Sequence, residues 1–150
     1  MGKNALGTNV VTQIAIVVHD IIKTSQAYAD FFDVEMPDIQ ITDGYDKSEM
    51  EHRNNPSQAR AKLAFFDMGS LQLELIEPDH EPSTWREHLD VKGEGVHHIA
   101  FEVNGMKAVI NDLEAKGMPL IQKGEYPGGR YAYMDTEKEL KVLFELLEND

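Results

Sequence analysis

The sequence of 150 residues contains no cysteine, no run of basic residues and no long apolar stretch. Without cysteine, disulfide bonds and thiolate ligands are excluded, so any metal ion must be held by histidine, carboxylate or amide groups. The 14 lysines and arginines are outnumbered by 27 aspartates and glutamates, which gives a formal net charge of -13. Binding to nucleic acid or to an anionic membrane needs clustered basic residues, so neither is an expected partner.

The sequence shows neither the pattern of a membrane span nor that of a secretory signal peptide. No apolar run approaches the roughly 20 residues of a membrane span. The N-terminal residues 1–7 lack the apolar core of a secretory signal peptide. The sequence therefore predicts a cytoplasmic protein, and its length predicts one domain over residues 1–150.

The most informative stretch is the segment 93–103. Two glycines precede an alternation of apolar and polar residues that predicts a strand with adjacent histidines at its start. Because neighbouring strand residues point to opposite faces, only one of His97 and His98 is expected to face an interior site. The upstream segment 12–18 repeats the pattern and places Gln13 at the position of His98. This equivalence selects His98, and His97 is expected to pack on the outer face.

A second internal repeat lies near the end of each half. The sequence LELIE at 73–77 is matched by FELLE at 144–148, so that Glu74 corresponds to Glu145. Two repeated motifs in the same order indicate that the chain consists of two copies of one unit.

Each copy is predicted to run as a strand, a helix and three further strands. The expected fold class is α+β, with two βαβββ modules in tandem forming a curved, mostly antiparallel sheet with a cleft. Module one is expected over about 10–78, a linker over 79–94 and module two over about 95–148. The polar segment 43–57 is the longest loop-like stretch, and loops of this length often act as functional lids.

Four candidate ligands occupy equivalent positions of the two units: Gln13 and His98 on the first strands, Glu74 and Glu145 on the last. Two copies of a curved sheet placed face to face would bring these side chains together. One imidazole, two carboxylates and one amide oxygen suit Zn²⁺, Ni²⁺, Co²⁺, Mn²⁺ or Fe²⁺, with positions left for water or substrate.

A structural explanation for the two glutamates stays open at this point. Glu74 and Glu145 have apolar neighbours in sequence, and a buried carboxylate needs a compensating charge. A bound cation would supply that charge. The alternative is a salt bridge to one of three basic residues, namely Arg60, Lys62 or Arg130.

Three motifs carry a family resemblance. They are the segments 74–78 (ELIEP), 93–100 (GEGVHHIA) and 142–146 (VLFEL). Residues 10–148 resemble the vicinal oxygen chelate superfamily, which includes glyoxalase I, methylmalonyl-CoA epimerase and extradiol dioxygenases and is built from paired βαβββ modules. Within it, the three motifs are most similar to the methylmalonyl-CoA epimerase branch.

The resemblance implies a divalent-metal-dependent isomerase or epimerase that removes a proton next to a carbonyl group. It implies Glu74, His98 and Glu145 as ligands of Zn, Co, Ni or Mn, with Glu145 as the catalytic base and Glu74 as a second base. Gln13 stands where epimerases usually have histidine and where some glyoxalase I enzymes have glutamine. The resemblance also implies a small carbonyl compound or an acyl-CoA as substrate, and a homodimer.

Two positions depart from the family patterns. Val17 stands where glyoxalase I carries an arginine for the glutathione carboxylate, and the third-strand segment 60–65 lacks the acid that epimerases have there. That segment contributes Arg60 and Lys62 instead, which together with Arg130 are candidate contacts for a carboxylate or phosphate of the substrate. A glyoxalase-I-like lactoylglutathione lyase and a metal-free small-molecule binding protein of the resistance type are the alternatives.

Overall fold

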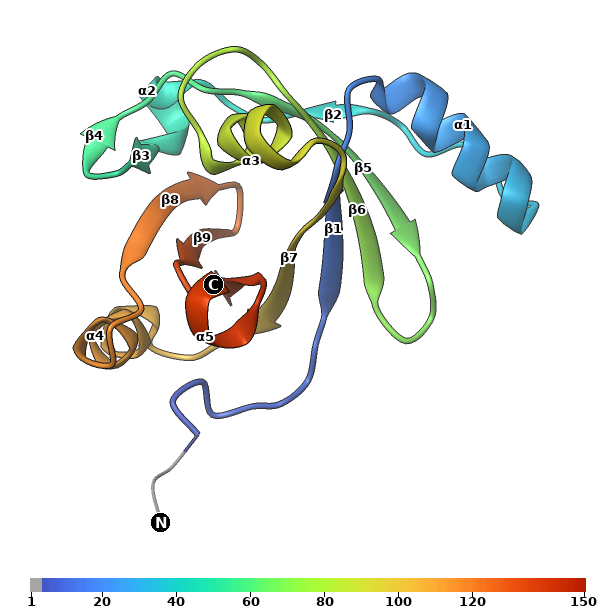
Figure 1. Cartoon of the computed structure of the whole chain (residues 1–150). Coiled ribbons are helices and arrows are strands. Elements are labelled where there is room, and N and C mark those ends of the chain that lie inside the picture. Colours follow the sequence, from blue (N-terminus) through green and yellow to red (C-terminus); the bar gives the residue numbers. More distant parts are fainter. Residues whose placement is uncertain (1–3) are drawn as a thin grey trace.

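The computed structural model describes residues 4–150. Residues 1–3, which belong to the predicted domain 1–150 and to the N-terminal segment 1–7, lie outside the described residues. A single sheet of ten strands is curled, with α1 and α4 on its outer face and α3 against its concave face (Figure 1). The concave face encloses a hollow lined by residues of both halves. Within the described part, no helix has the length and apolar character that crossing a membrane requires.

The elements follow one another along the chain in the order β1 (Gln13–Val17), α1 (Ile21–Phe32), β2 (Gln40–Ile41), α2 (Tyr45–Ser48), β3 (Glu51–His52), β4 (Asn55–Pro56), β5 (Ala61–Asp67), β6 (Gln72–Pro78), α3 (Thr84–Lys92), β7 (Gly95–Glu102), α4 (Met106–Ala115), β8 (Leu120–Tyr126), β9 (Gly129–Met134), α5 (Glu137–Leu140) and β10 (Leu143–Asn149).

Four strands of each half follow the same order outward from the centre of the sheet, β1-β6-β5-β2 and β7-β10-β9-β8, and the β3–β4 hairpin of the first half lies beyond β8. The full order is β2-β5-β6-β1-β7-β10-β9-β8-β3-β4. At the centre β1 pairs antiparallel with β7, and each of these strands also pairs in parallel with the last strand of its own half, β6 or β10. The predicted α+β class with a curved, mostly antiparallel sheet is confirmed.

Alternation along the strands separates the two faces of the sheet. Leu73 and Leu75 of β6 pack outward with Ile21 and Ala29 of α1 in one apolar cluster. A second outer cluster joins α4 to β9 and β10, and a third lines the concave face and includes Trp85 of α3. Since residues 73 and 75 face outward, Glu74 between them faces the hollow.

The segment 43–57 is more ordered than the expected loop. It forms α2 and then the β3–β4 hairpin, whose residue Glu51 pairs with Lys123 of β8. The segment therefore starts beside β2 at one edge of the sheet and pairs with the opposite edge, crossing the mouth of the hollow. Backbone pairing with β8 supplies the hydrogen bonds that hold this polar stretch in place.

Candidate metal and substrate site

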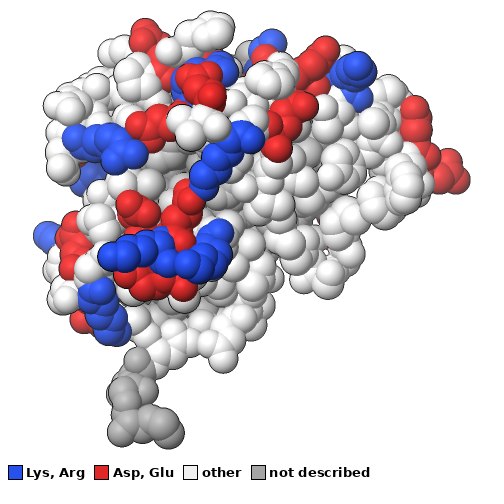
Figure 2. Space-filling model, in the orientation of Figure 1, with Lys and Arg blue, Asp and Glu red and all other residues white. Residues whose placement is uncertain are grey.

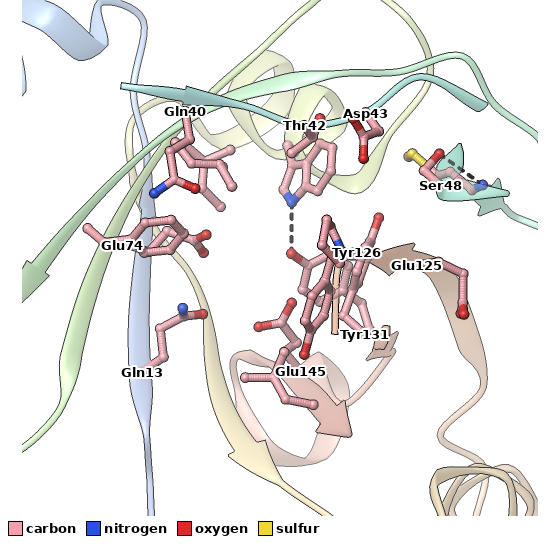
Figure 3. Close-up of a pocket in the computed structure, with 18 of the residues that line it drawn as sticks. Gln13, Gln40, Thr42, Asp43, Ser48, Glu74, Glu125, Tyr126, Tyr131 and Glu145 are labelled. Carbon is pink, nitrogen blue, oxygen red and sulfur yellow. Dashed lines mark hydrogen bonds between the residues drawn. The ribbon is translucent and has the colours of Figure 1, made fainter. Parts of the chain in front are cut away.

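The four predicted ligand residues lie on four strands that are neighbours at the centre of the sheet. Glu74 is on β6, Gln13 on β1, His98 on β7 and Glu145 on β10, in the spatial order β6-β1-β7-β10. All are buried, with exposed fractions between 0% for His98 and 7% for Glu74. The side chains of Gln13, Glu74 and Glu145 project into the same space (Figure 3). The sheet therefore brings together the residues that the internal repeats had paired.

The donor atoms of these side chains converge. His98 Nε2 lies 2.9 Å from Gln13 Oε1, 3.1 Å from Glu145 Oε1 and 3.6 Å from Glu74 Oε1. The Gln13 oxygen position is itself 3.1 Å from Glu145 Oε1 and 3.3 Å from Glu74 Oε1. Two ligands of one ion, each about 2.0–2.2 Å from it, are about 2.8–3.6 Å apart in tetrahedral or octahedral geometry. The five distances fall in this range.

Within residues 4–150, no three His, Asp or Glu side chains are by themselves arranged to hold a metal ion, and this applies to His98, Glu74 and Glu145. The Gln13 amide oxygen adds a fourth donor, because it lies 2.9–3.3 Å from His98 Nε2 and from both carboxylates. A carboxylate can also adjust by rotating its terminal torsion. The donor set, with one imidazole, two carboxylates and an amide, fits a divalent transition-metal ion.

The orientation of the Gln13 amide bears on this fit. Its nitrogen donates to Gln72 Oε1 at 2.7 Å, so its oxygen faces His98 Nε2 and the two carboxylates. An oxygen that faces only acceptors is favourable when a cation lies between them. With the amide reversed, its nitrogen would instead donate to Glu145, His98 and Glu74. Gln72 was missed by the sequence reasoning, although its spacing of two from Glu74 places it on the same strand face.

His97 does not pack on the outer face, and this expectation was wrong. The pairing of β1 with β7 shifts register at this point, from Ala15 opposite His98 to Ile16 opposite Val96, so His97 is the extra residue of a β-bulge. A bulge interrupts the alternation of faces and can redirect a side chain. Both histidine rings consequently lie on the concave side, with ring centroids 5.0 Å apart.

The two imidazoles form a hydrogen-bonded chain. His98 Nδ1 lies 2.8 Å from His97 Nδ1, and His97 Nε2 lies 3.1 Å from Thr84 Oγ1 of α3. Burial, reinforced by the neighbouring His98, lowers the pKa of His97 well below 6.5, so this ring is neutral at physiological pH. If His98 Nε2 presents its lone pair to an ion, its Nδ1–H donates to His97, which in turn donates to Thr84.

The two carboxylates influence each other. Burial, followed by the negative charge of Glu145, raises the pKa of Glu74 well above its usual value of 4.5. A raised pKa makes a carboxylate a stronger base near neutral pH. Glu74 is therefore suited to moving a proton.

A cavity of about 720 Å³ opens above this cluster and is lined by Gln13, Glu74 and Glu145. Trp85 of α3 and two tyrosines of β9, Tyr131 and Tyr133, form part of its wall. Trp85 Nε1 donates to Tyr133 Oη at 2.9 Å, and Gln122 Nε2 donates to Tyr131 Oη at 3.1 Å. A volume between about 300 and 1,000 Å³ is typical of small-molecule sites.

Burial raises the pKa of both tyrosines, so their phenols remain protonated. No functional role was assigned to these aromatic residues from the sequence. Their positions two apart on one strand were the available signal that they share a face.

The three basic residues predicted to bind substrate do not line the cavity. Arg60 Nε donates to the Thr42 carbonyl oxygen at 2.8 Å, and Lys62 Nζ lies 3.5 Å from Glu77. Arg130 pairs with Glu148 at 2.9 Å and with Asp150. None of the three contacts Glu74 or Glu145, so the structural salt-bridge explanation of these glutamates has no support within residues 4–150.

Comparison with known families agrees with this fold. Residues 12–133 match the glyoxalase/bleomycin resistance protein/dioxygenase superfamily. The match covers most of the chain, and the protein belongs to this family.

The individual proteins that resemble this chain share a third or less of its residues in the aligned regions. An uncharacterized protein of Bacillus subtilis (strain 168), YqjC, is 33% identical over 100 residues, covering 65% of this chain and 71% of the relative. The structure of methylmalonyl-CoA epimerase from Mycobacterium tuberculosis has a TM-score of 0.65 at 20% identity and covers 100% of this chain and 93% of its own. A Streptomyces coelicolor methylmalonyl-CoA epimerase variant in complex with 2-nitronate-propionyl-CoA has a TM-score of 0.61 at 22% identity, with 93% and 96% coverage.

Proposed function

We propose that this protein is a divalent-metal-dependent isomerase or epimerase that removes a proton from a carbon next to a carbonyl group. The observation that carries the proposal is the convergence of Gln13, Glu74, His98 and Glu145 at the base of one cavity. These four side chains would hold the ion, which could be Zn²⁺, Co²⁺, Ni²⁺ or Mn²⁺. When bound, it supplies positive charge to the carbonyl oxygen of the substrate.

The chain's own residues carry the proton. Glu145 takes the proton from the carbon, and the electron pair of the broken C–H bond moves toward the carbonyl oxygen. Glu74, from the other half of the chain, returns a proton to the opposite face in an epimerase or to the neighbouring carbon in an isomerase. The aromatic wall of Trp85, Tyr131 and Tyr133 restricts water around the reacting carbon.

A metal-free binding protein is the second candidate, because one observation favours it. With its amide reversed, the Gln13 nitrogen lies within 3.3 Å of His98 Nε2 and of both carboxylates, and its two N–H groups could link two of these three acceptors without an ion. A glyoxalase-I-like lyase has less support, because Val17 is fully buried and supplies no cation for the glutathione carboxylate.

The first experiment measures metal content and proton exchange together. The purified protein is subjected to elemental analysis and then incubated in D₂O with Zn²⁺, Co²⁺, Ni²⁺ or Mn²⁺ and a panel of carbonyl compounds. The panel contains methylmalonyl-CoA, the methylglyoxal–glutathione hemithioacetal and a neutral ketose. We expect stoichiometric metal and deuterium uptake next to the carbonyl of at least one compound, followed by NMR.

The variant Glu145→Gln should reduce this exchange by about 10²-fold or more, since it removes the base. Glu139→Gln on the exposed surface of α5 makes the same chemical change outside the cavity lining and should leave exchange unaltered. Exchange retained in Glu145→Gln removes Glu145 as the base. Absence of bound metal, with no gain on adding any of the four ions, favours the binding protein instead.

A further inference from the structure

The charges that line the cavity are all of one sign. Within residues 4–150, its wall includes five acidic residues and neither lysine nor arginine. The acidic residues are Asp43, Glu74, Glu102, Glu125 and Glu145. A divalent ion at the cluster would compensate the negative charges of Glu74 and Glu145. The negative charges of the other three residues would not be compensated by that ion. Figure 3 shows Asp43 and Glu125 on the upper and outer parts of the cavity, away from Gln13.

The basic residues near this rim contact other groups. Arg60 Nε donates to the carbonyl oxygen of Thr42, a residue that lines the cavity, at 2.8 Å. Arg130 lies 3.8 Å from Glu125, but its guanidinium pairs more closely with Glu148 at 2.9 Å and with Asp150. Lys123, also on β8, points to Glu51 at 3.9 Å. On the face drawn in Figure 2, basic side chains likewise lie among acidic ones. The overall charge of -13 adds to the negative potential that an approaching anion would meet.

Recognition of phosphate or carboxylate groups normally relies on arginine, lysine or a helix N-terminus. The cavity offers carboxylates as acceptors, together with uncharged polar groups from Gln40, Thr42 and Asn149. Carboxylates at a rim bind hydrogen-bond donors, such as hydroxyl or ammonium groups. The same carboxylates repel anions, so the affinity of the cavity for an anionic ligand is strongly reduced.

From this arrangement we infer that the substrate is a carbonyl compound without phosphate or carboxylate groups, which bears hydroxyl or ammonium groups that contact the acidic rim. The inference rests on the proposed function, because it names the substrate class of the same site. It sets this protein apart from the epimerase of the structural comparison, which was solved with an acyl-CoA compound. The volume of about 720 Å³ accommodates a molecule considerably larger than a three-carbon unit.

A series of probes with one carbon skeleton and three charges tests the inference. Fructose is neutral, 1-amino-1-deoxyfructose is cationic and fructose 1-phosphate is anionic. Binding to the metal-loaded protein is measured by calorimetry, and deuterium uptake at carbon 3 is measured by NMR. We expect the neutral or the cationic compound to bind, and the phosphate to bind at least about tenfold more weakly. Comparing fructose with its amine distinguishes hydroxyl from ammonium recognition.

A charge variant makes the test specific to the rim. The double variant Asp43→Asn, Glu125→Gln should bind the cationic compound more weakly. It should also reduce the difference in affinity between fructose and fructose 1-phosphate. Glu139→Gln should change neither affinity. Tighter binding of fructose 1-phosphate or methylmalonyl-CoA than of both other sugars overturns the inference, as does failure of both other sugars to bind at millimolar concentration. Binding with the expected charge order but without deuterium uptake contradicts the proposed function and leaves the charge selectivity standing.

Discussion

His97 has a role that depends on its partner rather than on any substrate. Its ring is the neighbour of His98 Nδ1 at 2.8 Å and is held on its other side by Thr84 at 3.1 Å. A hydrogen bond to the outer nitrogen of a histidine fixes the ring's tautomer and orientation, and so decides whether the inner nitrogen offers a lone pair. His97 is thus a positioning residue for His98.

We expect the variant His97→Phe to weaken metal binding by about 10–100-fold, the usual cost of removing a hydrogen-bond partner of a metal-binding histidine. Phenylalanine keeps the aromatic packing but offers His98 no acceptor. Co²⁺ titration followed by visible absorbance measures the affinity. His88→Phe is the matched control, since the ring of His88 lies 5.6 Å from that of His97, whereas the hydrogen bonds of His98 go to His97 and Gln13. Equal affinity in wild type and His97→Phe would remove the positioning role.

At the scale of the elements, the repeated glutamates have two different uses. Glu74 and Glu145 face the cavity, whereas residues three positions later on the same strands bind helix N-termini on the outer side. Glu77 accepts a hydrogen bond from the Ile21 N–H of α1 at 2.9 Å. Glu148 accepts from the N–H groups of Gly105 and Met106 of α4, at 2.7 and 3.0 Å. The odd spacing places each pair on opposite faces.

The carboxylate of Glu148 at the N-terminus of α4 should make the stability of the fold depend on pH. The hydrogen bond from the Met106 N–H, with those from Gly105 and Arg130, lowers the pKa of Glu148 below 4.5. The stabilisation is therefore fully present above pH 4.5 and is lost as the pH falls through the lowered pKa. We expect Glu148→Gln to lower the melting temperature by a few degrees at pH 7, and this difference to shrink in acid. Calorimetry at several pH values measures it, with Glu139→Gln as control; a difference that grows in acid would contradict the assignment.

The sequence could predict the part of the site that depends on repetition. Gln13 matched His98 and Glu74 matched Glu145 because equivalent strand positions of two similar units face the same side. The inward position of His97 could not be predicted, because the bulge arises from the pairing of β7 with β1, and strand periodicity alone does not show it. The contacts of Arg60 with Thr42 and of Arg130 with Glu148 join segments that are distant in the sequence, and spacing does not reveal them.

For the whole molecule, the site is where the two halves of the chain meet. Gln13 and Glu74 come from the first half and His98 and Glu145 from the second, and the central β1–β7 pair joins them. Two of these four side chains are buried carboxylates, whose mutual repulsion opposes folding when both are ionised. A cation at the cluster would convert that repulsion into attraction across the central pair, so metal binding should stabilise the entire fold.

We expect a stoichiometric ion to raise the melting temperature. At a free ion concentration 100 times the dissociation constant, binding to the folded state adds about 2.7 kcal/mol to the free energy of unfolding. For a protein of this size the corresponding increase is about 5–10 °C. Differential scanning calorimetry with Zn²⁺, Co²⁺, Ni²⁺ and Mn²⁺ measures it, and chelation should reverse it. In the variant His98→Ala, the ion should no longer raise the melting temperature. An equal rise in that variant would mean that the ion binds elsewhere on this acidic protein. No rise with any of the four ions would support the metal-free alternative.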